Sequence, residues 1–129
     1  PQEKKLIKGA AVILVVEDER NLRQFIREAL TGAGYTVQEA LNGEDAIQAV
    51  TRAVRPPDLI ITDIIMPKLD GRQMVDRITE MHRGIKVIFM SGYHDDRIGE
   101  NMTLSPNISF LQKPFNVSDL LAKIRDALK

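Results

Sequence analysis

Short apolar runs alternate along the chain with segments of helical periodicity, at a spacing of roughly 25 residues that is typical of βα units. The runs that we expect to form strands cover residues 11–16, 35–40, 58–63, 86–91 and 108–113. The first is continuously apolar, as expected for a central parallel strand. The second alternates and has fewer apolar residues, which places it at an edge of the sheet.

Between these runs, apolar residues recur at the i, i+3, i+4 spacing of a helix face. One face carries Leu22, Phe25, Ile26, Ala29 and Leu30; another carries Met74, Val75, Ile78 and Met81; the last carries Val117, Leu120, Leu121, Ile124 and Leu128. A further helix is expected over 42–54, stopped by two prolines, and a weak one over 95–104. Asn116 looks like an N-cap with Asp119 at N3.

This alternation predicts an α/β fold: a doubly wound, five-stranded parallel sheet with helices on both faces. Small sheets of this flavodoxin-like (βα)5 type commonly have strand order 2-1-3-4-5. Their ligands bind at the carboxyl ends of the strands, where the strand order reverses between strands 1 and 3.

Composition narrows the function classes. The 129 residues are enough for one domain, which we expect over 10–129, and the polar segment 1–9 is typical of a linker or disordered arm. The net charge is zero, so no broad attraction to nucleic acid or to a membrane surface is expected. The absence of cysteine excludes disulfides, thiolate metal sites and cysteine nucleophiles.

Polar residues stand where the expected strands end. Asp63 closes a strand of otherwise apolar neighbours, where a charge is costly unless it is compensated. Glu17 and Asp18 follow the first strand, Ser91 ends the fourth and Lys113 ends the fifth. The predicted strand order brings these five residues to one edge of the sheet.

Three carboxylates held close together repel one another, so either one is protonated or a cation lies between them. Oxygen ligands without His or Cys point to Mg²⁺ or Ca²⁺, and a small protein ligand set that leaves room for water and phosphate favours Mg²⁺. A carboxylate beside Mg²⁺ and a lysine can attack phosphorus and form an aspartyl phosphate. Lys113 and a hydrogen bond from Ser91 would stabilise the transferred group.

Each residue taken singly has an ordinary explanation. Glu17 and Asp18 suit a solvated first turn of a helix, Lys113 a surface position and Ser91 a turn. Only their joint placement at the strand ends favours a functional site.

Four motifs in register, "ILVVEDE", "DLIITDIIMPKLDG", "VIFMSGY" and "FLQKPF", resemble the receiver domain of two-component response regulators, over about 12–128. The resemblance implies that a histidine kinase or histidine phosphotransfer protein phosphorylates Asp63. It implies that Glu17, Asp18, Asp63 and the backbone carbonyl of Ile65 hold Mg²⁺.

The same resemblance assigns a conformational switch to Ser91 and Phe110, phosphoryl contact to Lys113 and a cis bond to Pro114. The domain would promote its own phosphorylation and dephosphorylation rather than act as an enzyme on external substrates. The output would be a changed surface that binds a downstream signalling protein.

The sequence departs from the family pattern at three positions. Glu17 stands where Asp is frequent, and Phe110 stands where Tyr is frequent. Ile65 is apolar at a position that influences water access, which predicts a long-lived phosphorylated state.

Competing classes are a haloacid-dehalogenase-type phosphatase, an FMN carrier and a degenerate receiver that acts only by binding. The phosphatase needs a second Asp where Ile65 stands. The acids after strand 1 would repel FMN phosphate, and a degenerate receiver would lack some of the site residues present here.

The residues of these motifs are most similar to those of C-terminal receivers of hybrid histidine kinases. This similarity, together with a sequence that starts at Pro1 and not at Met, favours a receiver from such a kinase over a stand-alone regulator. We expect a cytoplasmic domain that contacts neither nucleic acid nor membrane.

Overall fold

The computed structural model describes residues 11–64, 69–92 and 107–129. All five expected strands lie within these ranges. The expected arm over 1–9, the carbonyl of Ile65 and the weak helix over 95–104 lie outside them.

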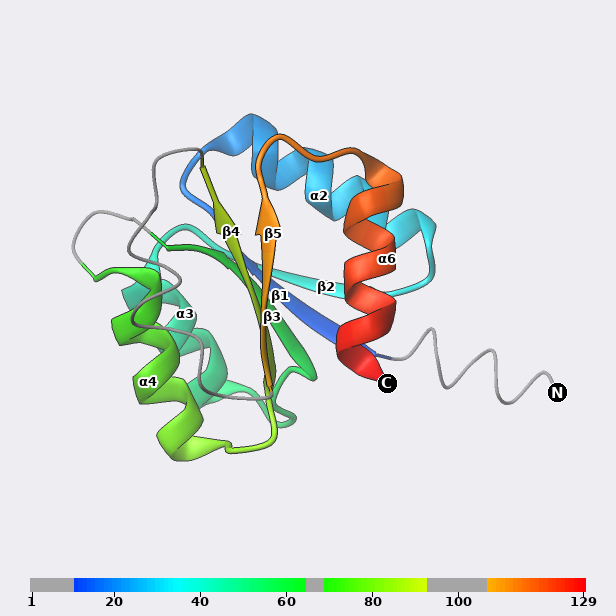
Figure 1. The fold of residues 1–129 in the computed structure, drawn as a ribbon. Helices are drawn as coiled ribbons and strands as arrows, with labels where there is room; N and C mark the ends of the chain where they lie inside the picture. Colours follow the sequence, from blue (N-terminus) through cyan, green and yellow to red (C-terminus); the bar gives the residue numbers. More distant parts are fainter. Residues whose placement is uncertain (1–10, 65–68, 93–106) are drawn as a thin grey trace, which may run out of the picture.

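The sheet has five parallel strands in the order β2-β1-β3-β4-β5, which confirms the predicted fold (Figure 1). The strands are β1 (Val12–Val16), β2 (Thr36–Ala40), β3 (Leu59–Asp63), β4 (Lys86–Ser91) and β5 (Ile108–Gln112). β2 lies at an edge, as its sparse apolar content predicts. β5 ends one residue earlier than expected, so Lys113 lies just beyond the strand.

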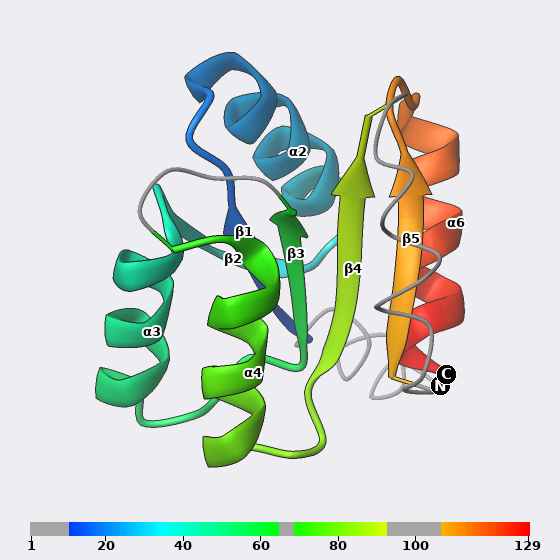
Figure 2. The ribbon, with the colours of Figure 1, turned by 60° about the vertical axis from the view of Figure 1, so that its left-hand side comes forward.

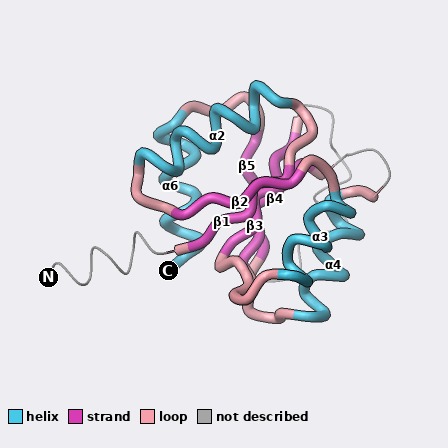
Figure 3. Tube along the Cα trace, turned by 180° about the vertical axis from the view of Figure 1, so that it is seen from behind, coloured by secondary structure: helices cyan, strands magenta, loops and turns pink. Residues whose placement is uncertain are grey.

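Alternating residues of the central strands face two separate cores because successive side chains point to opposite sides of a sheet. Ile13 and Val15 pack under α2 (Arg20–Gly32) and α6 (Val117–Leu128). Leu14 and Val16 pack under α3 (Gly43–Arg52) and α4 (Gly71–Met81). Figure 3 shows the two helix pairs on opposite sides of the sheet.

Side-chain caps fix where three of the helices begin. Asn42 accepts a hydrogen bond from the backbone N–H of Asp45 at 2.9 Å and so caps α3. Asp70 and Gln73 form a reciprocal capping box at α4. Asn116 and Asp119 form another at α6, which confirms the cap predicted from the sequence. These bonds satisfy N–H groups that have no partner inside the helix.

Three residues assigned to apolar helix faces are more exposed than expected. Phe25, Met81 and Val117 are 38%, 43% and 40% exposed, whereas Ile26, one residue from Phe25, is fully buried. Met81 is the last residue of α4, and Val117 is the first residue of α6. The Phe25 ring instead meets Phe115, with ring centroids 6.5 Å apart.

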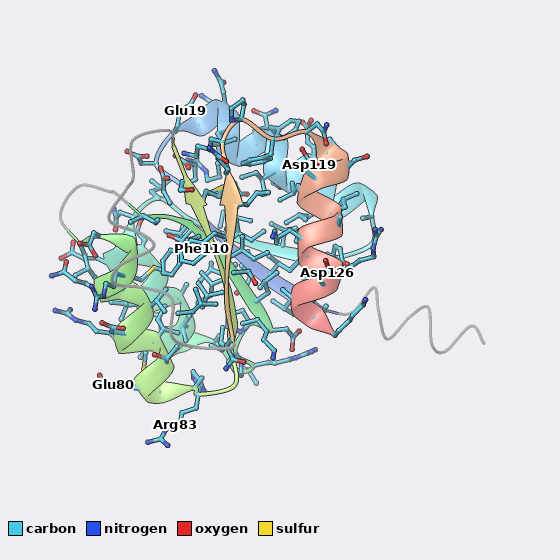
Figure 4. The ribbon with its side chains drawn as sticks, in the orientation of Figure 1. Glu19, Glu80, Arg83, Phe110, Asp119 and Asp126 are labelled. Carbon is cyan, nitrogen blue, oxygen red and sulfur yellow. The ribbon has the colours of Figure 1, made fainter. Side chains whose placement is uncertain are left out.

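The strands all run in one direction, so their carboxyl ends lie together at the end of the sheet that faces upward in Figure 2. Glu19 lies at this end of the molecule, whereas Glu80 and Arg83 lie at the opposite end (Figure 4). None of the helices in the described parts of the chain has the length and apolar character needed to cross a membrane.

Candidate metal and phosphoryl site

Four adjoining strands bring the predicted site residues to one edge. In the register of the sheet, Val16 lies beside Thr62, and Asp63 beside Met90. Ser91 lies beside Gln112. The last residues of these strands and the residues directly after them therefore meet at the same edge. Residues separated by dozens of positions in the chain become neighbours because parallel strands end together.

The carboxylates of Glu17, Asp18 and Asp63 form a compact acidic cluster. Each contributes one oxygen, and these three oxygens lie within 4.8 Å of one another. Glu17 is only 1% exposed, the Asp63 side chain is 19% exposed, and Asp18 is exposed to solvent. The cluster therefore has a buried floor and an open side from which an ion or a phosphoryl group can enter.

The Glu17 carboxyl group is electrostatically perturbed by its surroundings. Burial, together with the neighbouring Asp63 charge and the Asp18 contact, raises its pKa from 4.5 to about 7. The backbone N–H of Glu19, which donates to Glu17 Oε2 at 2.9 Å, and the charge of Lys113 lower the pKa by less.

The other carboxylate oxygen, Glu17 Oε1, is buried without a hydrogen-bond partner among the described residues. A buried, unsatisfied acceptor in a cluster with two other carboxylates costs free energy that a bound cation would recover. The all-oxygen donor set suits a hard cation such as Mg²⁺. The residues present therefore fit the metal that the sequence predicts.

Lys113 is the cationic member of the site. Its Nζ lies 3.0 Å from Asp63 Oδ1 and 3.9 Å from Glu17 Oε1. The backbone N–H of Lys113 donates to the Ser91 carbonyl at 2.7 Å, which extends the pairing of β4 and β5 past the last strand residue. The peptide bond between Lys113 and Pro114 is cis.

Ser91 and Phe110 occupy different positions relative to this edge. Ser91 is 7% exposed at the end of β4. Phe110 lies midway along β5 (Figure 4), where its ring stacks on that of Phe89 with centroids 5.9 Å apart and planes inclined by 27°. Phe110 is therefore packed against the core on the side of α3 and α4.

The structure adds three supporting residues that we did not predict from the sequence. Arg23 donates from Nη1 to the Glu17 carbonyl at 2.9 Å. Thr62 is fully buried and donates to the Asp63 carbonyl at 2.9 Å. Gly71 donates its N–H to the Ile64 carbonyl at 2.7 Å. Only Arg23 had a usable signal: a side chain in the first turn of a helix leans toward the preceding loop.

Comparison with known proteins gives a consistent result. The response regulator receiver domain family matches residues 13–125 of this chain. The sensor kinase CckA of Brucella abortus is 34% identical over 133 aligned residues, covering 99% of this chain and 14% of CckA. The chain thus spans about one seventh of that relative.

Two further relatives are short enough to compare over nearly their whole length. The response regulator receiver protein CpdR of Brucella abortus is 33% identical over 90% of this chain and 95% of CpdR. The crystal structure of the receiver domain from the hybrid histidine kinase CckA is 30% identical with a TM-score of 0.74, and the match covers 92% of this chain and 100% of that one. Together with the strand order and the acidic cluster above, these matches show that the chain belongs to the receiver domains of two-component response regulators.

Proposed function

We propose that Asp63 is the phosphoacceptor of this receiver domain and that Glu17 and Asp18 hold Mg²⁺ beside it. The observation that carries the proposal is the contact of Lys113 Nζ with Asp63 Oδ1 at 3.0 Å, within a cluster of three carboxylates. A lysine and a metal beside one strand-end carboxylate provide the charge compensation that phosphoryl transfer to that carboxylate requires.

In the proposed reaction, a carboxylate oxygen of Asp63 attacks the phosphorus of a phosphohistidine. The new O–P bond forms as the P–N bond breaks, and the imidazole nitrogen leaves with the electron pair and takes up a proton. Glu17, Asp18, Asp63 and the Ile65 carbonyl would hold Mg²⁺. The bound ion would compensate negative charge on the phosphoryl oxygens. Lys113 would contact the same oxygens, and Ser91 would donate a hydrogen bond to them.

The proposed output follows from the new charge on Asp63. Turning Ser91 toward the phosphoryl group would move its loop and allow Phe110 to repack, which changes the surface near β5 and α6 for a downstream signalling protein. The stacking of Phe110 on Phe89 supports an inward, packed position of this ring in the present state.

The proposed phosphoryl donor is a histidine kinase or a histidine phosphotransfer protein. The proposed output partner is a downstream signalling protein. Similarity to the sensor kinase CckA, whose receiver-domain structure is described as coming from a hybrid histidine kinase, supports a place within such a kinase. The proposed location of the domain is the cytoplasm. A phosphatase acting on external substrates has no supporting observation, because Ile65 stands where its second Asp is needed.

Labelling by an acyl phosphate such as acetyl phosphate in Mg²⁺ tests the proposal. The wild type should gain one phosphoryl group, and Asp63→Asn should gain none. Asp126→Asn is the matched control because its side chain is 73% exposed and lies on α6 away from the end of the molecule that carries Glu19 (Figure 4). Persistent labelling of Asp63→Asn would assign the acceptor to another residue. The wild type should gain no label when EDTA replaces Mg²⁺ from the start of the reaction.

A further inference from the structure

Arg23 connects the acidic cluster to the edge strand β2. Its side chain is 15% exposed and has two separate acceptors. Nη1 donates to the Glu17 carbonyl at 2.9 Å, and Nε donates to Glu39 Oε1 at 3.3 Å. The other Glu39 oxygen lies 3.4 Å from Nε of Arg27. Arg23 is thus oriented by a carboxylate from β2 and held against the backbone that carries the acids.

The surroundings of Glu17 leave one atom available to a ligand. Its N–H donates to the Ala40 carbonyl at 3.1 Å, and its Oε2 accepts from the N–H of Glu19 at 2.9 Å. Its carbonyl accepts from Arg23, so only the buried Oε1 lacks a hydrogen-bond partner in the described part of the chain.

The carbonyl held by Arg23 belongs to the peptide plane between Glu17 and Asp18. A rotation of this plane would redirect Asp18, which is exposed and follows the plane directly. The Arg23 side chain reaches back from the first turn of α2 to the Glu17 carbonyl, and the backbone N–H of Arg23 donates to the Glu19 carbonyl at 3.0 Å. Arg23 can therefore restrict the direction of both acids.

From this geometry we infer that Arg23 is a positioning residue for metal binding. By holding the Glu17 carbonyl it keeps the carboxylates of Glu17 and Asp18 converged on Asp63, and Glu39 keeps Arg23 in place. The inference rests on the proposed function only in taking the acidic cluster as the metal site. Arginine suits this role because its planar guanidinium presents several donors in fixed directions, whereas lysine presents one point charge.

Charge and position have opposite effects here, which makes the inference testable. Neutralising a cation near the cluster would, by electrostatics alone, strengthen binding of a divalent cation. Loss of positioning would weaken it. Arg27 is the matched control: it pairs with the same Glu39, is 59% exposed and is not the residue that donates to the Glu17 carbonyl.

The experiment is a calorimetric or NMR titration of Mg²⁺ at fixed ionic strength into the wild type, Arg23→Gln, Arg23→Lys and Arg27→Gln. We expect Arg23→Gln to raise the Mg²⁺ dissociation constant about 10-fold, the lower end of the range for residues that orient metal ligands. The dissociation constant of Arg23→Lys should lie between those of Arg23→Gln and the wild type. The dissociation constant of Arg27→Gln should stay within about twofold of the wild-type value, as expected for an exposed ion pair.

Acyl phosphate labelling adds a readout that a purely structural role would not change in this way. Arg23→Gln should need more Mg²⁺ for half-maximal labelling but approach the wild-type rate at saturating Mg²⁺. If Arg23→Gln does not fold, Glu39→Gln replaces it, and its Mg²⁺ dissociation constant should also rise. The inference is overturned if the variant used, Arg23→Gln or Glu39→Gln, binds Mg²⁺ as tightly as Arg27→Gln does. Failure of the wild type to label would instead overturn the proposed phosphoacceptor, and the Mg²⁺ titration would still decide the role of Arg23.

Discussion

Gly71 lies against the backbone of Asp63 so closely that a Cβ atom added to it would overlap the Asp63 carbonyl oxygen. Gly71 is the first residue of α4, and its N–H donates to the next carbonyl along, that of Ile64. The beginning of α4 thus depends on the same stretch of backbone that presents the proposed phosphoacceptor.

Gly71→Ala should therefore lower both stability and labelling. We expect a loss of about 1–3 kcal/mol in the free energy of unfolding, because an overpacked backbone contact must shift. Denaturant unfolding and acyl phosphate labelling measure the two effects. Gly32→Ala is the control, since a Cβ at that position meets nothing within 4 Å. Equal stability of the two variants would show that the α4 contact is not restrictive.

Lys113→Ala should separate metal binding from phosphoryl transfer. Removing a cation 3.0 Å from Asp63 and 3.9 Å from Glu17 leaves the cluster more negative, so Mg²⁺ should bind more tightly. Labelling at saturating Mg²⁺ should nevertheless fall by about 100-fold, the typical loss when one preorganised donor to the developing charge is removed.

Mg²⁺ titration and labelling rates measure these two opposite changes. Lys113→Arg keeps the charge, so its Mg²⁺ affinity should stay closer to that of the wild type than the affinity of the alanine variant does. A labelling rate of Lys113→Ala equal to that of the wild type would exclude a role of the lysine in transfer.

The raised pKa of Glu17 predicts how stability varies with pH in the absence of metal. The folded protein retains a proton on Glu17 that the unfolded chain releases between pH 4.5 and about 7. The stability contributed by this proton is fully present below pH 4.5 and is lost as the pH rises to about 7, by up to about 3 kcal/mol.

Glu17→Gln removes this loss, so the variant should gain stability relative to the wild type between pH 5 and pH 8 in EDTA. Unfolding by denaturant at several pH values measures the difference. Addition of Mg²⁺ at pH 8 should stabilise the wild type more than the variant. Glu80→Gln, at the opposite end of the molecule (Figure 4), is the control. A pH-independent difference between Glu17→Gln and the wild type would contradict the assigned pKa.

The stacked pair of Phe89 and Phe110 predicts unequal costs of truncation. Phe89 is fully buried, so Phe89→Ala should cost about 3–5 kcal/mol of unfolding free energy. Phe110 is only partly buried, and Phe110→Ala should cost less while leaving labelling of Asp63 intact. Equal losses of stability would contradict this ranking by burial, and loss of labelling in Phe110→Ala would show that the ring supports the site directly.

The sequence predicted much of the fold because neighbouring residues encode it. Continuous apolar runs and i, i+3, i+4 spacing marked the strands and helices, and Asn116 with Asp119 marked the beginning of α6. The isolated Asp63 in an apolar strand pointed to the site for the same reason: a charge in such a run needs compensation nearby.

Only the tertiary structure decided which distant groups supply that compensation. Lys113 meets Asp63 across 50 positions of the chain, and Arg23 finds the Glu17 carbonyl and Glu39 together only once α2 has packed beside β1 and β2. Phe25 fits the apolar stripe of α2 but lies at its margin against Phe115. Periodicity in the sequence predicts the direction in which a side chain points from its own helix or strand. The contacts and exposure of that side chain depend on how the other helices and strands pack around it.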